Sequence, residues 1–169
     1  MRHNSIFSIA AAAVLLLGLP ALAEDDLNPA AMAKALPQAS VALEKATKLS
    51  EREGKPISAK YEIEKGALQL SIYTKKGDRF SEVIIDHKTG AVAKDDWITD
   101  ADDMKAAQAQ DATMAKAKVT LDVATDNAVK ANPGYRAVSV MPKLEGGRPV
   151  AVVTLLKGED VKKVSEKLD

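Results

Sequence analysis

VALEKAT, residues 41–47, returns as VTLDVAT at residues 119–125, a spacing of 78 positions. In both stretches apolar residues and alanines recur three and four positions apart, which is the spacing of one helical face. The repeat therefore predicts two related structural units, each opened by a helix. We expect these helices from about Gln38 to Glu53, ended by Gly54, and from about Thr113 to Ala131, ended by Asn132-Pro133-Gly134.

Each predicted helix is followed by stretches that alternate polar and apolar residues, the pattern of strands with one buried face. We expect strands at 58–64, 67–73 and 80–86 in the first unit, and at 135–141 and 150–156 in the second. The last stretch, residues 158–169, differs from the first unit. Its Val161, Val164 and Leu168 are spaced three and four apart, which predicts a short closing helix in place of a third strand.

The last strand predicted in the first unit runs into VIIDHKTGAV, residues 83–92. Asp86 is placed to cap its own turn, and Gly90 to supply the positive φ that lets the chain reverse. With the helix and hairpin before it, this ending resembles the PepSY family of exported bacterial domains over residues 38–93. Residues 113–169 lack the Asp…Thr-Gly ending and resemble the family as a diverged second copy.

The resemblance implies an α+β fold of two PepSY-like units in tandem, each a helix packed on a small antiparallel sheet. PepSY domains occur in the propeptides of secreted metallopeptidases and in stand-alone periplasmic proteins. They are associated with inhibiting or regulating peptidases, and the family is not known as an enzyme fold. The resemblance therefore implies no catalytic residues, and it makes regulation of exported peptidases by protein–protein contact one expected function.

The first 23 residues have the pattern of a signal peptide. Arg2 and His3 form a basic start, an apolar run follows, and Ala21-Leu22-Ala23 offers a small-x-small cleavage site. The run is shorter than the roughly 20 residues that a membrane span needs. We expect Sec export to the periplasm as a soluble protein, without stable membrane insertion after cleavage. The mature chain would begin with a frayed lead-in at residues 24–37.

Composition excludes several function classes. The chain has 24 basic and 24 acidic side chains, a balance that argues against nucleic acid as a partner. It has no cysteine, hence no thiolate nucleophile and no cysteine zinc site. His87, the one histidine after the signal segment, falls in the DHKTG turn, where we expect it to be solvated. No serine has a histidine base placed in an orienting motif. We therefore expect no enzyme, no catalytic residue and no organic cofactor.

The remaining candidate is DDWITDADD, residues 95–103, inside an acidic connector at residues 94–112 that shows no strand pattern. Five of these nine residues are aspartates, and they surround the only tryptophan. Hard cations prefer carboxylate and carbonyl oxygens, so the segment predicts a site for Ca²⁺ or a trivalent lanthanide. Its candidate ligands are Asp95, Asp96, Asp100, Asp102 and Asp103, and Glu24, Asp25 and Asp26 form a second, smaller cluster.

Other interpretations of this segment stay open. It is also typical of a charged linker that starts a helix, and it lacks EF-hand spacing, because Met104 and Lys105 replace an oxygen ligand and the glycine. Trp97 fits either an anchor onto the first unit or an exposed contact residue. We predict a non-catalytic periplasmic binding protein. Its partner would be a metal cation or an envelope protein such as a peptidase, and a structural or sensory accessory role is the third alternative. The sequence does not predict an oligomeric state.

Overall fold

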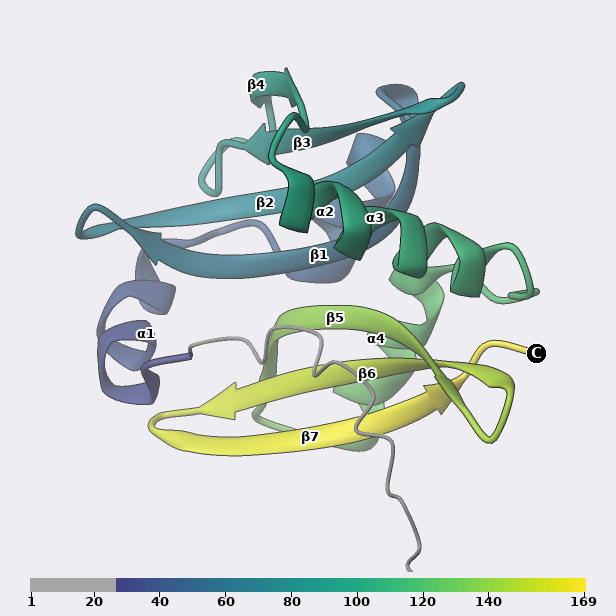
Figure 1. The fold of residues 1–169 in the computed structure, drawn as a ribbon. Coiled ribbons are helices and arrows are strands. Elements are labelled where there is room, and N and C mark those ends of the chain that lie inside the picture. The colour runs from purple at the N-terminus through teal and green to yellow at the C-terminus, as the bar shows by residue number, and fades with distance from the viewer. Residues whose placement is uncertain (1–26) are drawn as a thin grey trace, which may run out of the picture.

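Within residues 27–169, seven strands form one antiparallel sheet in the order β4-β3-β2-β1-β5-β6-β7, with four α-helices around it (Figure 1). The computed structural model describes residues 27–169, so the predicted signal peptide and the Glu24, Asp25, Asp26 cluster lie outside the described residues. The strands are β1 (Lys55–Glu64), β2 (Ala67–Lys76), β3 (Arg79–Ile85), β4 (Val92–Trp97), β5 (Arg136–Glu145), β6 (Arg148–Lys157) and β7 (Asp160–Lys167). The α-helices are α1 (Pro29–Ala35), α2 (Leu43–Leu49), α3 (Ala101–Met114) and α4 (Leu121–Ala131), with 3-10 turns η1 (Leu36–Gln38) and η2 (Ser50–Arg52).

The α+β class is as predicted, but the separate small sheets are not. The two halves share one sheet because β1 pairs with β5 at its centre, where Ala59 lies opposite Val140 and Lys60 opposite Ser139. The prediction of two units, each a helix on its own small sheet, is therefore wrong. An exposed strand edge leaves backbone groups unpaired, and joining the two β-meanders removes one such edge from each of them.

The internal repeat extends over the strands as well as the helices. Strands of the second half follow their counterparts at a spacing of 81 residues, as from Ala59 to Val140. The ladder of β1 with β2 is irregular around Ile57, and that of β5 with β6 is irregular at the matching place, around Val138. Because Ala59 pairs with its own counterpart, an approximate twofold axis passes through this pair and relates the two halves.

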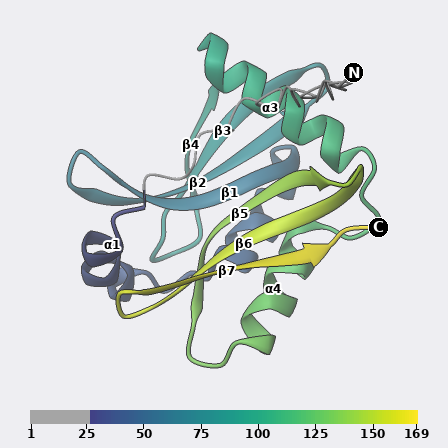
Figure 2. The same ribbon diagram turned by 60° about the horizontal axis from the view of Figure 1, so that its bottom comes forward.

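Helices α2 and α4 keep the spacing of 78 residues that the sequence repeat shows. Helices lie on both faces of the sheet. Helices α2 and α4 contact each other on one face, and α3 crosses the other face over β1 and β5 (Figures 1 and 2). A buried threonine in each of α2 and α4 bonds back to its own helix. The Thr47 hydroxyl donates to the Leu43 carbonyl at 2.8 Å, and that of Thr125 to Leu121 at 2.7 Å. The matching contacts confirm that the VALEKAT repeat marks equivalent helices.

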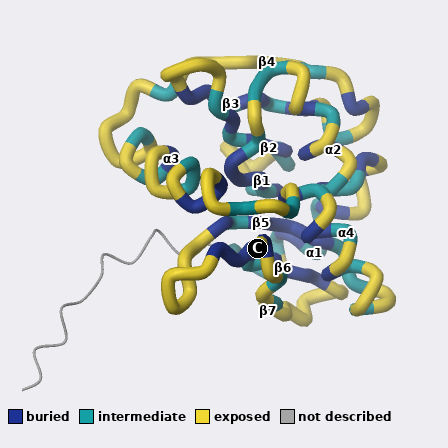
Figure 3. Tube along the Cα trace, turned by 90° about the vertical axis from the view of Figure 1, so that its right-hand side faces the viewer, coloured by how far each residue is buried: buried dark blue, intermediate teal, exposed yellow. Residues whose placement is uncertain are grey.

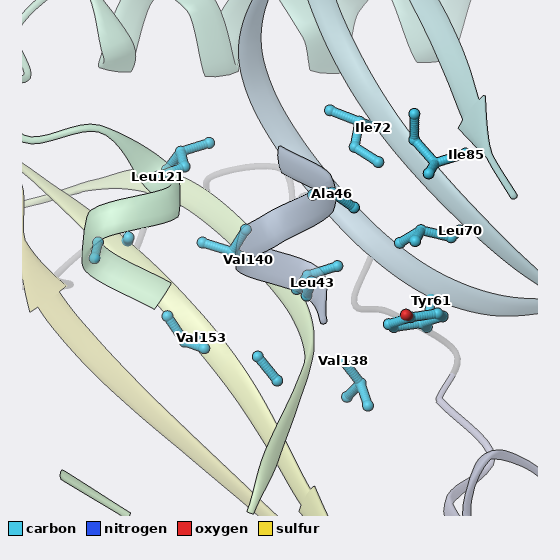
Figure 4. Close-up of a cluster of buried hydrophobic side chains, with 14 of the residues drawn as sticks. Leu43, Ala46, Tyr61, Leu70, Ile72, Ile85, Leu121, Val138, Val140 and Val153 are labelled. Carbon is cyan, nitrogen blue, oxygen red and sulfur yellow. The ribbon is translucent and has the colours of Figure 1, made fainter. Parts of the chain in front are cut away.

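Much of the core lies between the sheet and the α2–α4 pair, and Ala107 and Met114 of α3 belong to the same buried cluster. Leu43 and Ala46 of α2 point toward Tyr61, Leu70 and Ile72 of the sheet, as Figure 4 shows. Along the edge-on view of Figure 3 the central strands are mostly buried, while β4 and β7 at the two ends are largely exposed. The two open edges of the sheet are therefore its most accessible backbone.

Two predictions for the chain ends are corrected. Residues 29–38 are not frayed: they form α1 and η1, and Met32 is only 2% exposed where α1 contacts β1, β2 and β6. The predicted closing helix at 158–169 is the strand β7, which pairs along its whole length with β6. Helical spacing of Val161, Val164 and Leu168 was misleading because pairing with β6 supplies the backbone hydrogen bonds that a helix would have made.

The middle of the chain also differs from the prediction. The connector at 94–112 contains a strand, since β4 pairs with β3, and then the helix α3. The single helix expected from Thr113 to Ala131 is two elements, because α3 ends at Met114 and α4 begins at Leu121. The expected strands of both units are present: β1, β2, β5 and β6 are longer than predicted, and β3 is shifted by one residue toward the N-terminus.

Candidate functional site

The first two aspartates of DDWITDADD lie on the edge strand β4. Asp95 is opposite Val83 of β3, and Asp96 is opposite Glu82. Adjacent residues of a strand point to opposite faces of the sheet, so these two carboxylates diverge. Asp96 also forms an ion pair with Lys94 on the same strand, at an exposed position. The structure therefore does not bring Asp95 and Asp96 together as a pair of ligands.

The last three aspartates start a helix. Asp100 is the N-cap of α3, and its Oδ1 accepts hydrogen bonds from the main-chain N–H of Asp102 at 2.9 Å and of Asp103 at 3.1 Å. Capping satisfies amides that have no partner inside the helix, and acidic residues in the first turn favourably meet the helix dipole. The helix start that the linker interpretation includes is therefore present in the structure. Asp100, Asp102 and Asp103 lie within one turn, and all three are exposed.

Within residues 27–169, no group of three or more histidine, aspartate or glutamate side chains is arranged to hold a metal ion. The five predicted ligands fall into two sets, Asp95 and Asp96 on β4 and the other three at the start of α3. A cation would have to draw these sets together. Metal binding by this segment stays a prediction.

Trp97 ends β4 and is held by a cation–π contact. It lies opposite Ser81, and 40% of its surface is exposed. The guanidinium carbon of Arg79 is 3.8 Å from the centroid of its ring, within the range of a cation–π interaction. The next residue, Ile98, donates its N–H to the Phe80 carbonyl at 2.9 Å. Trp97 is therefore fixed in position while much of its ring stays open to solvent.

A polar network on β1 and β2 was not foreseen from the sequence. The Lys60 ammonium is 2.6 Å from Oε2 of Glu62, and the fully buried Ser71 hydroxyl donates to Oε1 of Glu62 at 2.9 Å. Burial raises the pKa of the neighbouring Tyr73 phenol, and the carboxylates of Glu82 and Glu62 raise it further. Alternating polar residues in β1 and β2 were the available signal. The network satisfies its own groups, which is typical of a structural role.

The DHKTG turn confirms two predictions and corrects one. Asp86 accepts hydrogen bonds from the N–H groups of Thr89 and Lys88, which lower the pKa of its carboxyl, and Gly90 has a φ of +81°. His87 is not simply solvated. Its carbonyl accepts from the N–H groups of Ser40 and Val41, and its Nδ1 is buried without a partner among the described residues. His87 therefore ties the turn to the start of α2.

A hollow on the surface lies where α2 and α4 meet the start of β1. It has a volume of about 310 Å³ and is lined in part by Thr47, Glu51, Lys55 and Leu121. The Lys55 ammonium donates to the Met114 carbonyl at 3.3 Å, and Glu51 pairs with Lys48 at 2.7 Å. Lys55 and Glu51 thus have protein partners, while Asp122 in the same lining forms no ion pair with a described residue.

Comparisons with models of protein families, with curated proteins and with solved structures give no match to the chain. The PepSY resemblance therefore stays a prediction. Among the described residues, no helix combines the length and the apolar character that crossing a membrane requires.

Proposed function

We propose that the protein is a non-catalytic binding protein of the periplasm that contacts an envelope protein through a surface centred on Trp97. The observation that supports this most is the exposed Trp97 ring stacked on Arg79 at the edge of the sheet. Tryptophan and arginine are the side chains most enriched among residues that dominate protein interfaces. A ring already held in place also loses less conformational entropy when a partner covers it.

The class of envelope protein comes from the resemblance. A PepSY-like chain is expected to regulate or inhibit an exported peptidase, and Trp97 is placed to anchor such a contact. A photo-reactive residue at position 97 tests this in the exporting cell. We expect one dominant crosslinked partner, absent when the same residue replaces Val123, a control side chain that is 46% exposed on α4. Equal crosslinking from both positions, or none from either, would count against the Trp97 surface.

A hard cation is the second ligand that we propose for this segment. It is favoured by the cap of α3, which brings Asp100, Asp102 and Asp103 within one helical turn with all three exposed. Trp97 is close enough in sequence to sensitise a bound lanthanide. We expect saturable Tb³⁺ emission on excitation of Trp97, displaced by Ca²⁺ or La³⁺.

The matched variants separate ligand loss from unfolding. Asp100→Asn with Asp102→Asn removes two charges but leaves an asparagine cap, which is as favourable as aspartate. We expect emission to be lost in this variant and kept in Asp122→Asn with Asp126→Asn on α4. If neither terbium emission nor binding calorimetry detects binding, the cation is excluded as a ligand and the protein partner remains the proposal.

A further inference from the structure

The strands β3 and β7 are counterparts in the two halves, yet their outer edges differ. The outer edge of β3 is covered by β4, which pairs with it from Ser81 to Ile85. Within residues 27–169, no strand pairs with the outer edge of β7, which ends the sheet. Repetition of the first half would place an eighth strand there.

The outward backbone groups of β7 can be identified from β3. At the outer edge of β3, the Phe80 carbonyl accepts the N–H of Ile98 at 2.9 Å. Val161 is the counterpart of Phe80 at the spacing of 81 residues. Backbone groups of every second residue point to the same edge of an antiparallel strand. The N–H and carbonyl groups of Val161, Lys163 and Ser165 therefore point outward.

The side chains of β7 are matched to an acidic strand. In the first half, Asp96 of β4 lies opposite Glu82 of β3, a like-charged pair that is unfavourable. The counterpart of Glu82 in β7 is Lys163. Lys163 and Lys167 are exposed and form no ion pair with any described residue. An aspartate added as Asp96 is added to β3 would meet a lysine instead of a glutamate.

The same lysines disfavour a second copy of this chain as the occupant. Two β7 strands paired edge to edge about Lys163 would bring this lysine of both copies together, and like charges across a ladder are destabilising. Lysine on an edge strand is a known protection against such self-pairing. With an acidic strand at this edge, the lysines of β7 would instead form favourable pairs with carboxylates.

We propose that the outer edge of β7 is a docking site for an extended acidic segment of a partner protein, which adds as an eighth strand. Main-chain hydrogen bonds to Val161, Lys163 and Ser165 would supply affinity, and the lysines would select acidic sequences. This surface lies at the opposite end of the sheet from Trp97 (Figure 3), so it goes beyond the contact proposed above.

The chain itself supplies the probe for a test. A synthetic peptide of residues 91–99, AVAKDDWIT, carries the strand that caps β3 in the first half. We expect its addition to the ¹⁵N-labelled mature protein to give saturable amide shifts, largest at Val161, Lys163 and Ser165. A scrambled peptide should give none. Absence of such shifts at about 1 mM peptide, the weak end of specific affinities, overturns the proposal.

Variants of β7 then identify the contact. Lys163→Glu replaces an attraction by a repulsion, and we expect about tenfold weaker peptide binding. Lys34→Glu makes the same charge change at an exposed position on α1 and should leave binding unchanged. Ser165→Pro removes an N–H group that points outward, and an edge strand tolerates proline at such a position. We expect this variant to fold but not to bind the peptide. If that variant does not fold, Lys163→Glu alone decides. Equal weakening by both charge variants overturns the proposal.

Two further measurements separate this site from other occupants. Trp97→Ala should leave peptide binding unchanged, because its surface is at the other edge. Sedimentation equilibrium of the mature protein should show no dimer that depends on Ser165. A wild-type dimer that dissociates in Ser165→Pro would assign the edge to a second copy and overturn the acidic partner.

Discussion

The two halves make the same backbone contact after their third strand but secure it with different side chains. His87 and Leu168 are counterparts, and the carbonyl of each accepts two N–H groups from the segment before the following helix: Ser40 and Val41 for His87, Lys118 and Val119 for Leu168. After this carbonyl the first half turns and adds β4. In the second half, Leu168 is itself fully buried. The two halves thus share the backbone contact, whereas the side chain of the residue that makes it differs, histidine at position 87 and leucine at position 168.

The largest effect should come from removing the buried member of this pair. Leu168→Ala deletes a fully buried side chain, and we expect a loss of about 3 kcal/mol in the free energy of unfolding. His87→Ala removes a partly exposed ring whose carbonyl contact is retained, so a loss of about 1 kcal/mol or less is expected. Urea unfolding of both variants measures the difference. Equal losses would mean that the carbonyl contact, and not the side chain, determines stability.

The turn that leads to β4 offers a second comparison, between two glycines of nearly equal φ. Gly90 has φ +81°, and a Cβ there would be 3.1 Å from Cδ1 of Leu49; Gly66 has φ +80° and no atom within 4 Å of the same position. Alanine at Gly66 should cost about 1 kcal/mol for the left-handed backbone alone. Gly90→Ala should cost about 2 kcal/mol, because the contact with Leu49 is added. Thermal unfolding of the two variants shows whether this turn is packed against α2; identical melting temperatures would contradict that packing.

These differences also show what the sequence could and could not predict. Alternation and glycine turns identified the strands from Lys55 to Ile85, because hydrophobic period and turn chemistry are local properties. The pairing of Ala59 with Val140 depends on two strands that are distant in sequence and have no local pattern that specifies register. A single sheet was therefore not predicted.

The closing helix was predicted wrongly even though the chain carries a signal against it. Gly158 follows Gly77 at the strand spacing of 81 residues, and both have positive φ in the turn before a third strand. The helices repeat at 78, so alignment on VALEKAT alone places the second half three residues out of register. Val161 and Val164 satisfy the helical period by coincidence, and both are β-branched residues that favour strands.

Within the candidate segment, the start of a helix is the feature that local residues indicate. A cap at Asp100 follows from its place before an acidic first turn. The exposed stack of Trp97 on Arg79 depends on β4, whose residues Lys94, Asp95 and Asp96 have low strand propensity. Pairing with β3 overrides that propensity, so the geometry of Trp97 was not available from the sequence.

Tyr61, in the first half of the molecule, makes the stability of the fold depend on pH in the alkaline range. It is 3% exposed, its hydroxyl donates to the Val41 carbonyl, and burial raises its pKa to about 12. The folded state therefore holds the phenolic proton more tightly than the unfolded state. This contribution to stability is complete below the ordinary tyrosine pKa of about 10 and is lost as pH rises toward 12.

Tyr61→Phe should cost about 1 kcal/mol at neutral pH through the lost buried hydrogen bond. It should also make the fall in stability between pH 10 and 12 shallower, but should not remove it, since burial raises the pKa of Tyr73 in the same direction. Urea unfolding across this range measures both effects. An unchanged alkaline slope would show that Tyr61 is not held as a buried donor.

The smallest effect concerns the acid side and the DHKTG turn. Hydrogen bonds from Thr89 and Lys88 lower the pKa of Asp86, so the turn is stabilised above the ordinary aspartate pKa and loses this contribution as pH falls through the lowered value. Asp86→Asn keeps an acceptor oxygen without the charge and should reduce the acid sensitivity slightly. Asp78→Asn is the control, because Asp78 is an exposed carboxylate in the turn at the other end of β3. Melting temperatures from pH 6 down to about 2 should differ from wild type only for Asp86→Asn, since only this variant removes the charged acceptor that the turn stabilises. A matching shift in Asp78→Asn would mean that general charge, and not the cap of the turn that adds β4, governs stability in acid.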